Sequence, residues 1–384
     1  MTIYIKVFKM DRRSFLKKSL TASTLVASSG MLLSACGRNL RSDLMNNTQI
    51  SGAPAIEKLN SDGYKILYYA SCAPSGHNSQ PWFVKIKSQM DWIVGSDSNR
   101  WLPIVDGSKR EVLLSLGAFV ENLVQAAAAF GYEVETSILA KNSQDPEVVG
   151  IQLKKSTHQM NTLERIINRR TVKSHLLDKD LKASDVEDFS TLSDGNLYYF
   201  PKDSHHGRLM AKEAVDNFVF QTNNKQAVAE LADWIRLKDK QAINLRDGLT
   251  PDGMEITGAA GWYVRNFMNK KDVQGDTFQN KGIEKVRQQV KQGAGWIAIT
   301  SEGTDVKDLI ESGRRFQRMA LVAREKMIAI HPMTQTLEEK NGQKKIRANH
   351  HPTTIPQFML RVGYLDKYPD PVSLRRPVEW FVRV

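Results

Sequence analysis

The pattern of apolar and polar positions predicts short strands and long buried helices. Residues 83–86 (FVKI), 91–94 (DWIV) and 296–299 (WIAI) are short runs rich in β-branched and aromatic residues, which is typical of strands. Residues 113–130 and 309–330 place apolar side chains at helical spacing, so we expect a long amphipathic helix in each. A strand followed by a helix therefore occurs twice along the chain.

The two helical segments also align with each other. Setting Gly117 on Gly313 matches apolar or small residues in both segments: Leu113 with Leu309, Leu123 with Met319, Val124 with Ala320, and Ala127 with Ala323. An internal repeat explains this match. Two similar amphipathic helices packed in one core would explain it as well.

The N-terminal residues have the order of an export signal. Residues 11–17 (DRRSFLK) resemble a twin-arginine signal, and an apolar run over residues 20–35 is too short and too polar for a good membrane span. The run ends in LSAC, which resembles a lipoprotein processing box, so we expect residues 1–35 to be removed and Cys36 to carry a lipid. The alternative is an N-terminal amphipathic helix. Residues 36–55 are mostly polar and are expected to form a flexible tether.

This interpretation places the folded body on the periplasmic side of a membrane, held there by the lipid. The twin-arginine route exports proteins already folded, often with a cofactor inserted. Export by this route therefore agrees with a non-covalent cofactor that is loaded before transport.

Composition narrows the partners of the folded body. The formal charge of the chain is +12, and because residues 1–35 carry six basic and one acidic residue, the remainder is about +7. Basic residues do not form a run interleaved with aromatics, so we expect no nucleic acid partner; the charge favours phosphate-bearing ligands and anionic membrane surfaces. With Cys36 lipidated, Cys72 has no disulfide partner and is expected to be a small buried residue. The histidines show no metal-ligand spacing, so no metal is expected.

Residues 73–82 (APSGHNSQPW) form the most informative connection in the chain. They lie between a helix-like apolar run at residues 66–70 and the strand predicted at residues 83–86. One interpretation is a tight turn capped by Ser75 and Asn78. The other is a loop of small and polar residues whose backbone approaches a flat ligand.

A second polar segment has the residue types that hold a phosphate. Residues 168–173 (NRRTVK) follow the apolar-periodic residues 163–167, and residues 373–377 (SLRRP) lie near the C-terminus. A phosphate monoester favours a guanidinium fork, an ammonium and a hydroxyl that converge on it. The alternative is a basic helix end, where cations interact favourably with the helix dipole.

Taken together, these segments resemble the nitroreductase family. A-P-S-x-x-N-x-Q-P-W resembles its flavin-contacting loop, R-R-[ST]-x-[RK] its phosphate-binding signature, SLRRP its last phosphate contact, and residues 356–364 its final central strand. The resemblance implies an α+β fold with central, mainly antiparallel sheets flanked by helices, and FMN as the cofactor. It also implies the cofactor-binding residues, which are Pro74, Ser75, Gly76, Asn78, Arg169, Thr171, Lys173 and Arg375. Backbone donors at residues 332–334 would lie near the reactive edge of the flavin.

The order of the motifs implies a fused dimer. In the homodimeric nitroreductases the loop and the arginine segment of each site come from different subunits. Here each occurs once, so the chain resembles the Acg-like branch. The resemblance implies two tandem halves, residues 56–155 and 156–384, that form an intrachain pseudo-dimer with one site, and a monomeric protein. Residues 223–292 have no counterpart in the first half and are either a surface helical insertion or a lid over the flavin.

The function implied is an exported FMN-dependent oxidoreductase that passes electrons to a small acceptor, a nitroaromatic or a quinone. Such an enzyme needs no catalytic acid or nucleophile, so no catalytic residue is predicted. NAD(P)H is not normally supplied outside the cytoplasm, which leaves the electron donor open. A flavin-sequestering protein with a lidded site and little turnover is the main alternative, and a scaffold that has lost the flavin is a weaker one.

Overall fold

The structure is a computed structural model that describes residues 40–46, 56–349 and 353–384. The predicted signal peptide and the lipidated Cys36 lie outside these residues. The export and lipid-anchor hypotheses therefore stay predictions.

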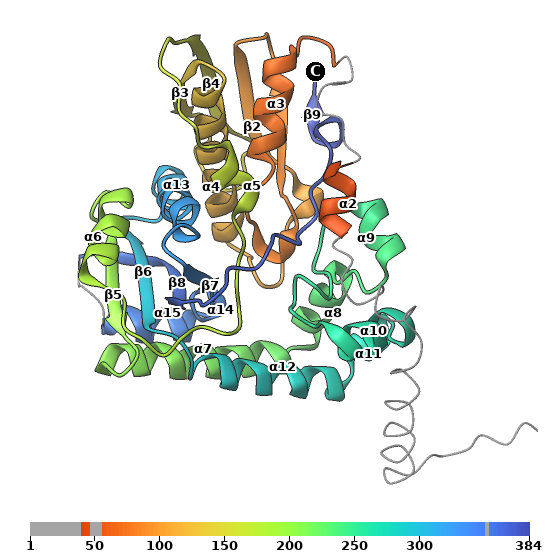
Figure 1. Ribbon diagram of the computed structural model, residues 1–384, viewed down its shortest axis with the longest axis vertical. Helices are drawn as coiled ribbons and strands as arrows, with labels where there is room; N and C mark the ends of the chain where they lie inside the picture. Colours follow the sequence, from red (N-terminus) through yellow and green to blue (C-terminus); the bar gives the residue numbers. More distant parts are fainter. Residues whose placement is uncertain (1–39, 47–55, 350–352) are drawn as a thin grey trace, which may run out of the picture.

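Two mainly antiparallel sheets form the framework (Figure 1). The first has the strand order β3-β4-β2-β1-β9 and the second the order β5-β6-β8-β7. The bounds are β1 Trp82–Ile86, β2 Asp91–Ser96, β3 Tyr132–Ile138, β4 Glu147–Lys155, β5 Leu197–Pro201, β6 Gly295–Ser301, β7 Ile328–Pro332, β8 Ile355–Tyr364 and β9 Val382–Arg383. The pairing of β1 with β9 is parallel, and the other strand pairs are antiparallel.

The second sheet is covered on both faces, which explains its unbroken apolar strands. Ile297 and Ile299 of β6 belong to the main core, together with Phe316 of helix α13 (Val306–Ala323). Trp296 and Ala298 point the other way and belong to a cluster with Met210 of helix α7 (His205–Asn223). Since successive side chains of a strand alternate between faces, burial on both faces requires a continuous apolar run.

Helices α4 (Arg110–Ala129) and α13 cross each other at two glycines, Gly117 and Gly313. A Cβ on Gly117 would lie 2.1 Å from the Ile310 carbonyl oxygen, and a Cβ on Gly313 would lie 2.1 Å from the Leu114 carbonyl oxygen. Each Cβ would also lie 3.0 Å from the Cα of the other glycine. Only glycine allows the two backbones to approach this closely.

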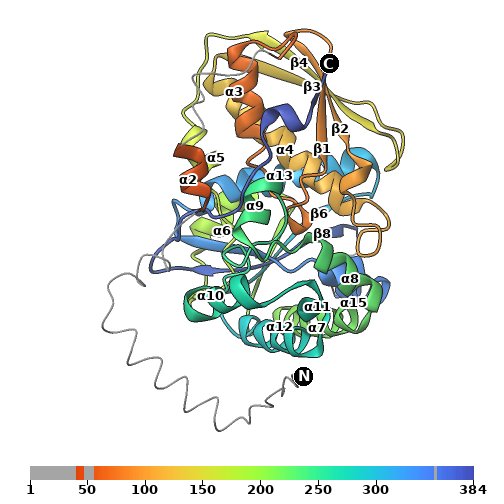
Figure 2. The same cartoon turned by 90° about the vertical axis from the view of Figure 1, so that its right-hand side faces the viewer.

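A set of helices between β5 and β6 extends along one end of the molecule (Figures 1 and 2). They are α7, α8 (Lys225–Trp234), α9 (Asp239–Leu245), α10 (Gly258–Phe267), α11 (Lys270–Gln274) and α12 (Asp276–Gln289). Local caps define several of their ends: the Asn224 side chain accepts from the backbone of Gln226 and Ala227, and Asn269 forms a capping box with Asp272. Helix α7 ends at Asn223, where the expected segment of residues 223–292 begins, and α8 to α12 lie within that segment.

The remaining α-helices are shorter than α4 and α13. They are α2 (Leu40–Asn46), α3 (Ser61–Ala70), α5 (Leu163–Asn168), α6 (Ala183–Leu192), α14 (Gln335–Glu338) and α15 (Lys340–Ala348). Figure 2 shows α2 beside α5, and Arg41 of α2 donates to the Ile167 carbonyl oxygen of α5 at 3.0 Å. Residues 40–46 therefore differ from the flexible tether expected there.

The predicted fold class is confirmed, with one correction to its elements. The structure is α+β, with mainly antiparallel sheets flanked by helices. The helix expected at residues 309–330 is too long, because α13 ends at Ala323 and residues 328–332 form β7. The chain turns at Met327, whose φ of 55° is left-handed. Apolar residues 327–330 fit a buried strand as well as they fit a helix, so periodicity alone did not place this boundary.

Candidate cofactor site

A cavity of about 350 Å³ lies where the two sheets and the helical insertion meet. All eight residues predicted to bind the cofactor line it: Pro74, Ser75, Gly76, Asn78, Arg169, Thr171, Lys173 and Arg375. The structure therefore brings together segments that lie almost three hundred residues apart in the sequence. Their binding role stays a prediction.

The loop after α3 has an unusual backbone. His77, Asn78 and Gln80 have φ angles of 49°, 53° and 54°, in the left-handed region that non-glycine residues seldom adopt. The Ser75 hydroxyl accepts from the Gln80 backbone N–H at 2.9 Å, which closes the turn. Strain of this kind is kept where surrounding contacts hold it, and it is common at ligand sites.

Asn78 connects this loop to two other segments. Its amide nitrogen donates to the carbonyl oxygens of Gly248 and Leu374, both at 3.2 Å, and its amide oxygen accepts from Arg375 at 2.9 Å. Asn78 thus fixes the position of Arg375 as well as lining the cavity. Gln80 adds a second link, because its side-chain oxygen accepts from the Arg376 backbone N–H at 2.9 Å.

Two guanidinium groups, one on buried Arg169 and one on half-buried Arg375, line the cavity without a carboxylate partner among the described residues. Arg169 is 8% exposed, and neither Arg169 nor Arg375 has an ion pair among the described residues. Burial lowers the pKa of Arg169 to about 10 and that of Arg375 to about 9. The Nε atoms of both side chains are buried and have no hydrogen-bond partner in the part of the chain that the structure describes. An uncompensated buried charge is costly, so this arrangement favours an anion.

The neighbouring Arg170 has a structural position. It lies 4.0 Å from the Glu255 carboxylate and donates to the backbone oxygen of Asp370. Glu255 belongs to the insertion and also accepts from the Lys173 backbone N–H at 2.8 Å. The two arginines therefore have different positions. Arg169 faces the cavity, and Arg170 connects residues 168–173 to the insertion through Glu255.

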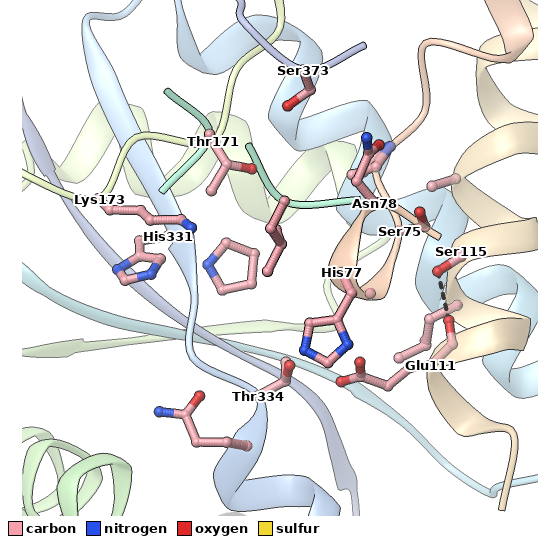
Figure 3. A pocket seen from close by; sticks show the side chains of 18 of the residues that line it. Ser75, His77, Asn78, Glu111, Ser115, Thr171, Lys173, His331, Thr334 and Ser373 are labelled. Atoms are coloured by element: carbon pink, nitrogen blue, oxygen red, sulfur yellow. Dashed lines mark hydrogen bonds between the residues drawn. The ribbon is translucent and has the colours of Figure 1, made fainter. Parts of the chain in front are cut away.

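Lys173 and His331 form a basic wall of the cavity (Figure 3). Burial lowers the pKa of Lys173, and Glu255 partly opposes this effect. Burial also lowers the pKa of His331 well below its usual range, and the nearby Arg361 adds to the effect. His331 is therefore neutral at neutral pH. Pro332 and Thr334, in the segment expected near the reactive edge, line the same cavity.

The sequence did not predict an acidic group on the far side of the cavity. Glu111 of α4 and Glu338 of α14 both line it, together with His77. Figure 3 shows Glu111 and Thr334 on one side of the cavity, with Ser373 and Thr171 on the other. Burial lowers the pKa of His77 to about 4, against a smaller opposing effect of Glu111, so its imidazole is neutral at neutral pH. A histidine inside the loop motif was the one visible signal of this group.

The helical insertion contributes to the cavity wall. Four residues of the predicted segment 223–292 line the cavity, namely Gly248, Leu249, Thr250 and Gly253, and Phe218 and Gln221 of α7 line it as well. The insertion therefore reaches the site and is not confined to the surface. A planar ligand with a phosphate fits these residues, because small loop residues and apolar rings line the cavity, while Arg169 and Arg375 lie in its wall without a carboxylate partner among the described residues.

Comparison with known proteins identifies distant relatives. No family model matches the chain. Two uncharacterised proteins of Mycobacterium tuberculosis, from strains CDC 1551 and H37Rv, are each 22% identical over 339 residues, covering 81% of this chain and 90% of theirs.

Several solved structures match part of the chain. A nitroreductase-like family protein from Bacillus cereus is 10% identical and covers 60% of this chain and 98% of its own, with a TM-score of 0.33. The FMN-dependent nitroreductase NfnB from Mycobacterium smegmatis, solved with NADPH, is 12% identical over 58% of this chain and 96% of its own, with a TM-score of 0.35. A nitroreductase with bound FMN from Bacteroides fragilis is 10% identical over 54% and 89%, with a TM-score of 0.30. Each of these structures matches only part of this chain.

Proposed function

We propose that this protein binds one FMN in the cavity and is an oxidoreductase of the nitroreductase type. The observation that carries the proposal is the pair of guanidinium groups, on Arg169 and Arg375, that line the cavity and have no carboxylate partner in the part of the chain that the structure describes. A terminal phosphate supplies the missing negative charge, and each charge-assisted hydrogen bond contributes roughly 1.5–3 kcal/mol.

The residues of the chain have distinct roles in this proposal. Arg169, Thr171, Lys173 and Arg375 hold the phosphate and nearby oxygens. Pro74, Ser75 and Gly76 contact the ring or its chain, and Asn78 keeps Arg375 in place. FMN supplies the redox chemistry, since it accepts a hydride and passes electrons to a nitroaromatic or quinone. The protein binds and orients the flavin and excludes water from it.

We also infer that the chain is an intrachain pseudo-dimer, as the Acg-like resemblance implies. The strand orders β1-β2-β4-β3 and β5-β6-β8-β7 correspond, and α4 and α13 follow the second strand of each set. The contacts at the crossing are reciprocal: Gly117 meets Ile310 as Gly313 meets Leu114. Reciprocal contacts of equivalent residues are what a two-fold axis produces.

The same correspondence explains why one site is proposed and not two. The connection before β5 is residues 193–196, where the loop before β1 is residues 71–81. Ala118 lines the cavity, whereas its counterpart Arg314 is held by the Glu121 carboxylate at 3.1 Å. Arg318 joins the same carboxylate at 3.4 Å and Asp194 at 2.6 Å. Ion-paired side chains thus occupy the position of a second site.

Export by the twin-arginine route, with a lipid on Cys36 and the body on the periplasmic side, is part of the same proposal. The sequence of residues 11–36 supports it. A lipid-anchored flavoprotein in that compartment needs an electron donor other than cytosolic NAD(P)H. A radiolabelled fatty acid incorporated into the wild type and absent from Cys36→Ala would support the anchor, and equal labelling of both would refute it.

Flavin sequestration is the second candidate function, and the insertion favours it. Four residues of segment 223–292 line the cavity, and a lid over the flavin requires such contacts. A lid that keeps acceptors out would store the flavin with little turnover.

One experiment separates these functions. The purified protein is expected to show the absorption of bound FMN, and a colourless protein that cannot be reconstituted would refute the cofactor proposal. The bound flavin is then reduced chemically and mixed with a quinone or a nitroaromatic. Rapid reoxidation by these acceptors supports the oxidoreductase. Slow reoxidation together with tight FMN binding supports sequestration.

A further inference from the structure

Helix α10 of the insertion has a group of aromatic side chains on its outer surface. The centroid of the Phe267 ring lies 5.2 Å from that of Trp262 and 5.4 Å from that of Tyr263, so the three rings form one aromatic face. Trp262, Tyr263 and Phe267 are 49%, 54% and 59% exposed, whereas Val264 of the same helix is buried. Contiguous exposed apolar side chains of this kind mark a surface that binds a partner or a membrane.

The first described residues of the chain lie on the same side of the molecule as the aromatic face. Leu40 of α2 packs with Ala242 of α9 in one apolar cluster. Helix α9 is joined in turn to α10, because Lys238 donates to the Arg265 carbonyl oxygen at 2.6 Å and the Arg265 guanidinium donates to Asp239 at 3.1 Å. Figure 1 shows α2, α9 and α10 along the right-hand side of the molecule, and Figure 2 shows them from that side.

The chain between α2 and the expected lipid is short. Cys36 precedes Leu40 by four residues, and a fully extended chain advances at most about 3.6 Å per residue, so their Cα atoms lie within about 14 Å of each other. A lipid on Cys36 would therefore hold the side of the body with α2 and α9 close to the bilayer. A body on a long flexible tether could instead turn any of its faces to the membrane.

We propose that the aromatic face of α10 docks on the membrane that holds the lipid, with its rings in the headgroup region of a bilayer that contains anionic phospholipid. This inference rests on the lipid anchor of the proposed function. Trp and Tyr are favoured at this depth, because their rings are buried while the N–H or O–H group stays in contact with water. Lys240 of α9 and Lys271 of α11 are exposed and have no ion pair among the described residues, so they are available to attract anionic headgroups.

The docking is tested first without the lipid, on residues 36–384, which include all the described residues. This protein should cosediment with vesicles of phosphatidylethanolamine and phosphatidylglycerol. Trp262→Ala and Phe267→Ala should each weaken the binding by about tenfold, since each removes one large apolar side chain from the contact.

Trp380→Ala is the matched control for these variants. Trp380 is 50% exposed, as Trp262 nearly is, but it lies just before β9, at the other end of the molecule from α10 (Figure 1). This variant should bind the vesicles as tightly as the wild type. Absence of binding by the wild type, or equal binding by all four proteins, would overturn the inference.

The lipidated protein provides a second test, in vesicles whose lipid acyl chains carry bromine, which quenches tryptophan fluorescence on contact. The part of the emission that Trp262→Phe removes should be quenched in these vesicles, and the part that Trp380→Phe removes should not. An unquenched Trp262 would show that α10 does not reach the bilayer.

Two further outcomes separate this inference from its alternatives. If light scattering without vesicles finds a dimer that Trp262→Ala converts to a monomer, the face binds a second copy of the chain and the docking proposal is wrong. If Cys36 carries no lipid, the anchor of the proposed function fails, and the vesicle experiment on the lipid-free protein still decides whether the aromatic face binds a membrane.

Discussion

At the residue scale, the ion pairs of an arginine indicate whether it binds a ligand or only supports the fold. Several partly exposed arginines of this protein have a carboxylate partner, as Arg165 has with Glu325 at 2.6 Å. Arg169 has none among the described residues, although it is almost completely buried. A structural arginine would stabilise the protein without a ligand, whereas a ligand-binding arginine stabilises it only when the anion is present.

Arg169→Ala should therefore weaken FMN binding without lowering the stability of the FMN-free protein. Loss of a charge-assisted bond of roughly 1.5–3 kcal/mol predicts FMN binding weaker by about ten- to hundredfold. The free energy of unfolding of the FMN-free protein should not fall, because the change removes an unpaired buried charge. Fluorescence titration with FMN and chemical denaturation of the apoprotein measure the two effects.

Arg165→Ala is the matched control, since Arg165 lies one helix turn away on the surface. It should leave FMN affinity unchanged, because an exposed ion pair contributes about 1 kcal/mol at most to stability and Arg165 does not line the cavity. An Arg169→Ala protein that keeps normal FMN affinity would exclude Arg169 from the site.

Asp106 predicts how stability changes with pH. Burial and the Glu111 charge raise its pKa to about 7, from an ordinary value of 3.8. In that interval the folded state binds more protons than the unfolded state, so the contribution of Asp106 to stability decreases as pH rises from about 4 to about 7. Asp106→Asn keeps an oxygen that can accept from the Val112 N–H, as Asp106 does at 3.0 Å. The variant should lose less stability than the wild type over this range, measured by denaturation at several pH values; parallel curves would contradict the assignment.

The sequence predicted the cavity residues that belong to continuous motifs. Residues 73–82 and 168–173 could be recognised because their residue types and spacing are local. Glu111 and Glu338 could not, because their places in the cavity wall depend on how distant parts of the chain are arranged in space. The sequence also did not predict that Asn78 and Arg170 connect distant segments, because both side chains donate to backbone oxygens that lie far away in the sequence.

At the element scale, the crossing of α4 and α13 fixes the two walls of the cavity. Ser115 and Ala118 of α4 line the cavity, and so does Phe316 of α13. The crossing glycines set the distance between these helices, and a side chain there would push them apart.

Gly117→Ala should therefore destabilise the protein and widen the site. Its Cβ would lie 2.1 Å from the Ile310 carbonyl oxygen, and overpacking in a core typically costs roughly 1–3 kcal/mol. Gly282→Ala in α12 is the control, because its Cβ would meet the Phe218 ring at an ordinary 3.6 Å and alanine favours a helix by up to about 1 kcal/mol. Thermal denaturation should rank Gly282→Ala at or above the wild type and Gly117→Ala below it. A neutral Gly117→Ala would show that the crossing is looser than described.

The alignment of Gly117 with Gly313 was visible in the sequence, but its meaning was open. Two amphipathic helices in one core would give the same match of apolar positions. The structure adds the reciprocal contact of the two glycines, which sequence similarity does not contain. The end of α13 shows the opposite case, because a buried strand directly after a helix extends the apolar pattern and hides the boundary.

At the scale of the whole molecule, the proposed pseudo-dimer predicts that different side chains fill equivalent positions on α4 and α13. The cavity is lined on α4 by small residues such as Ala118. The other side has Arg314 and Arg318 on α13, paired with Glu121, which is 2% exposed, and with Asp194. A buried, paired carboxylate stabilises this packing and leaves no guanidinium free for a phosphate.

The chain is accordingly expected to bind one FMN as a monomer. Light scattering should give the mass of a single chain, and titration followed by the absorbance of protein-bound flavin should saturate at one FMN per chain. Glu121→Gln tests why a second FMN is not expected, because it removes the charge that pairs with Arg314 and Arg318. The protein should lose about 3–5 kcal/mol of stability, as other broken buried ion pairs do, and still bind one FMN. A second FMN bound by the wild type would contradict the account of the filled site. A dimeric protein in which each FMN needs both chains would contradict the intrachain pseudo-dimer itself.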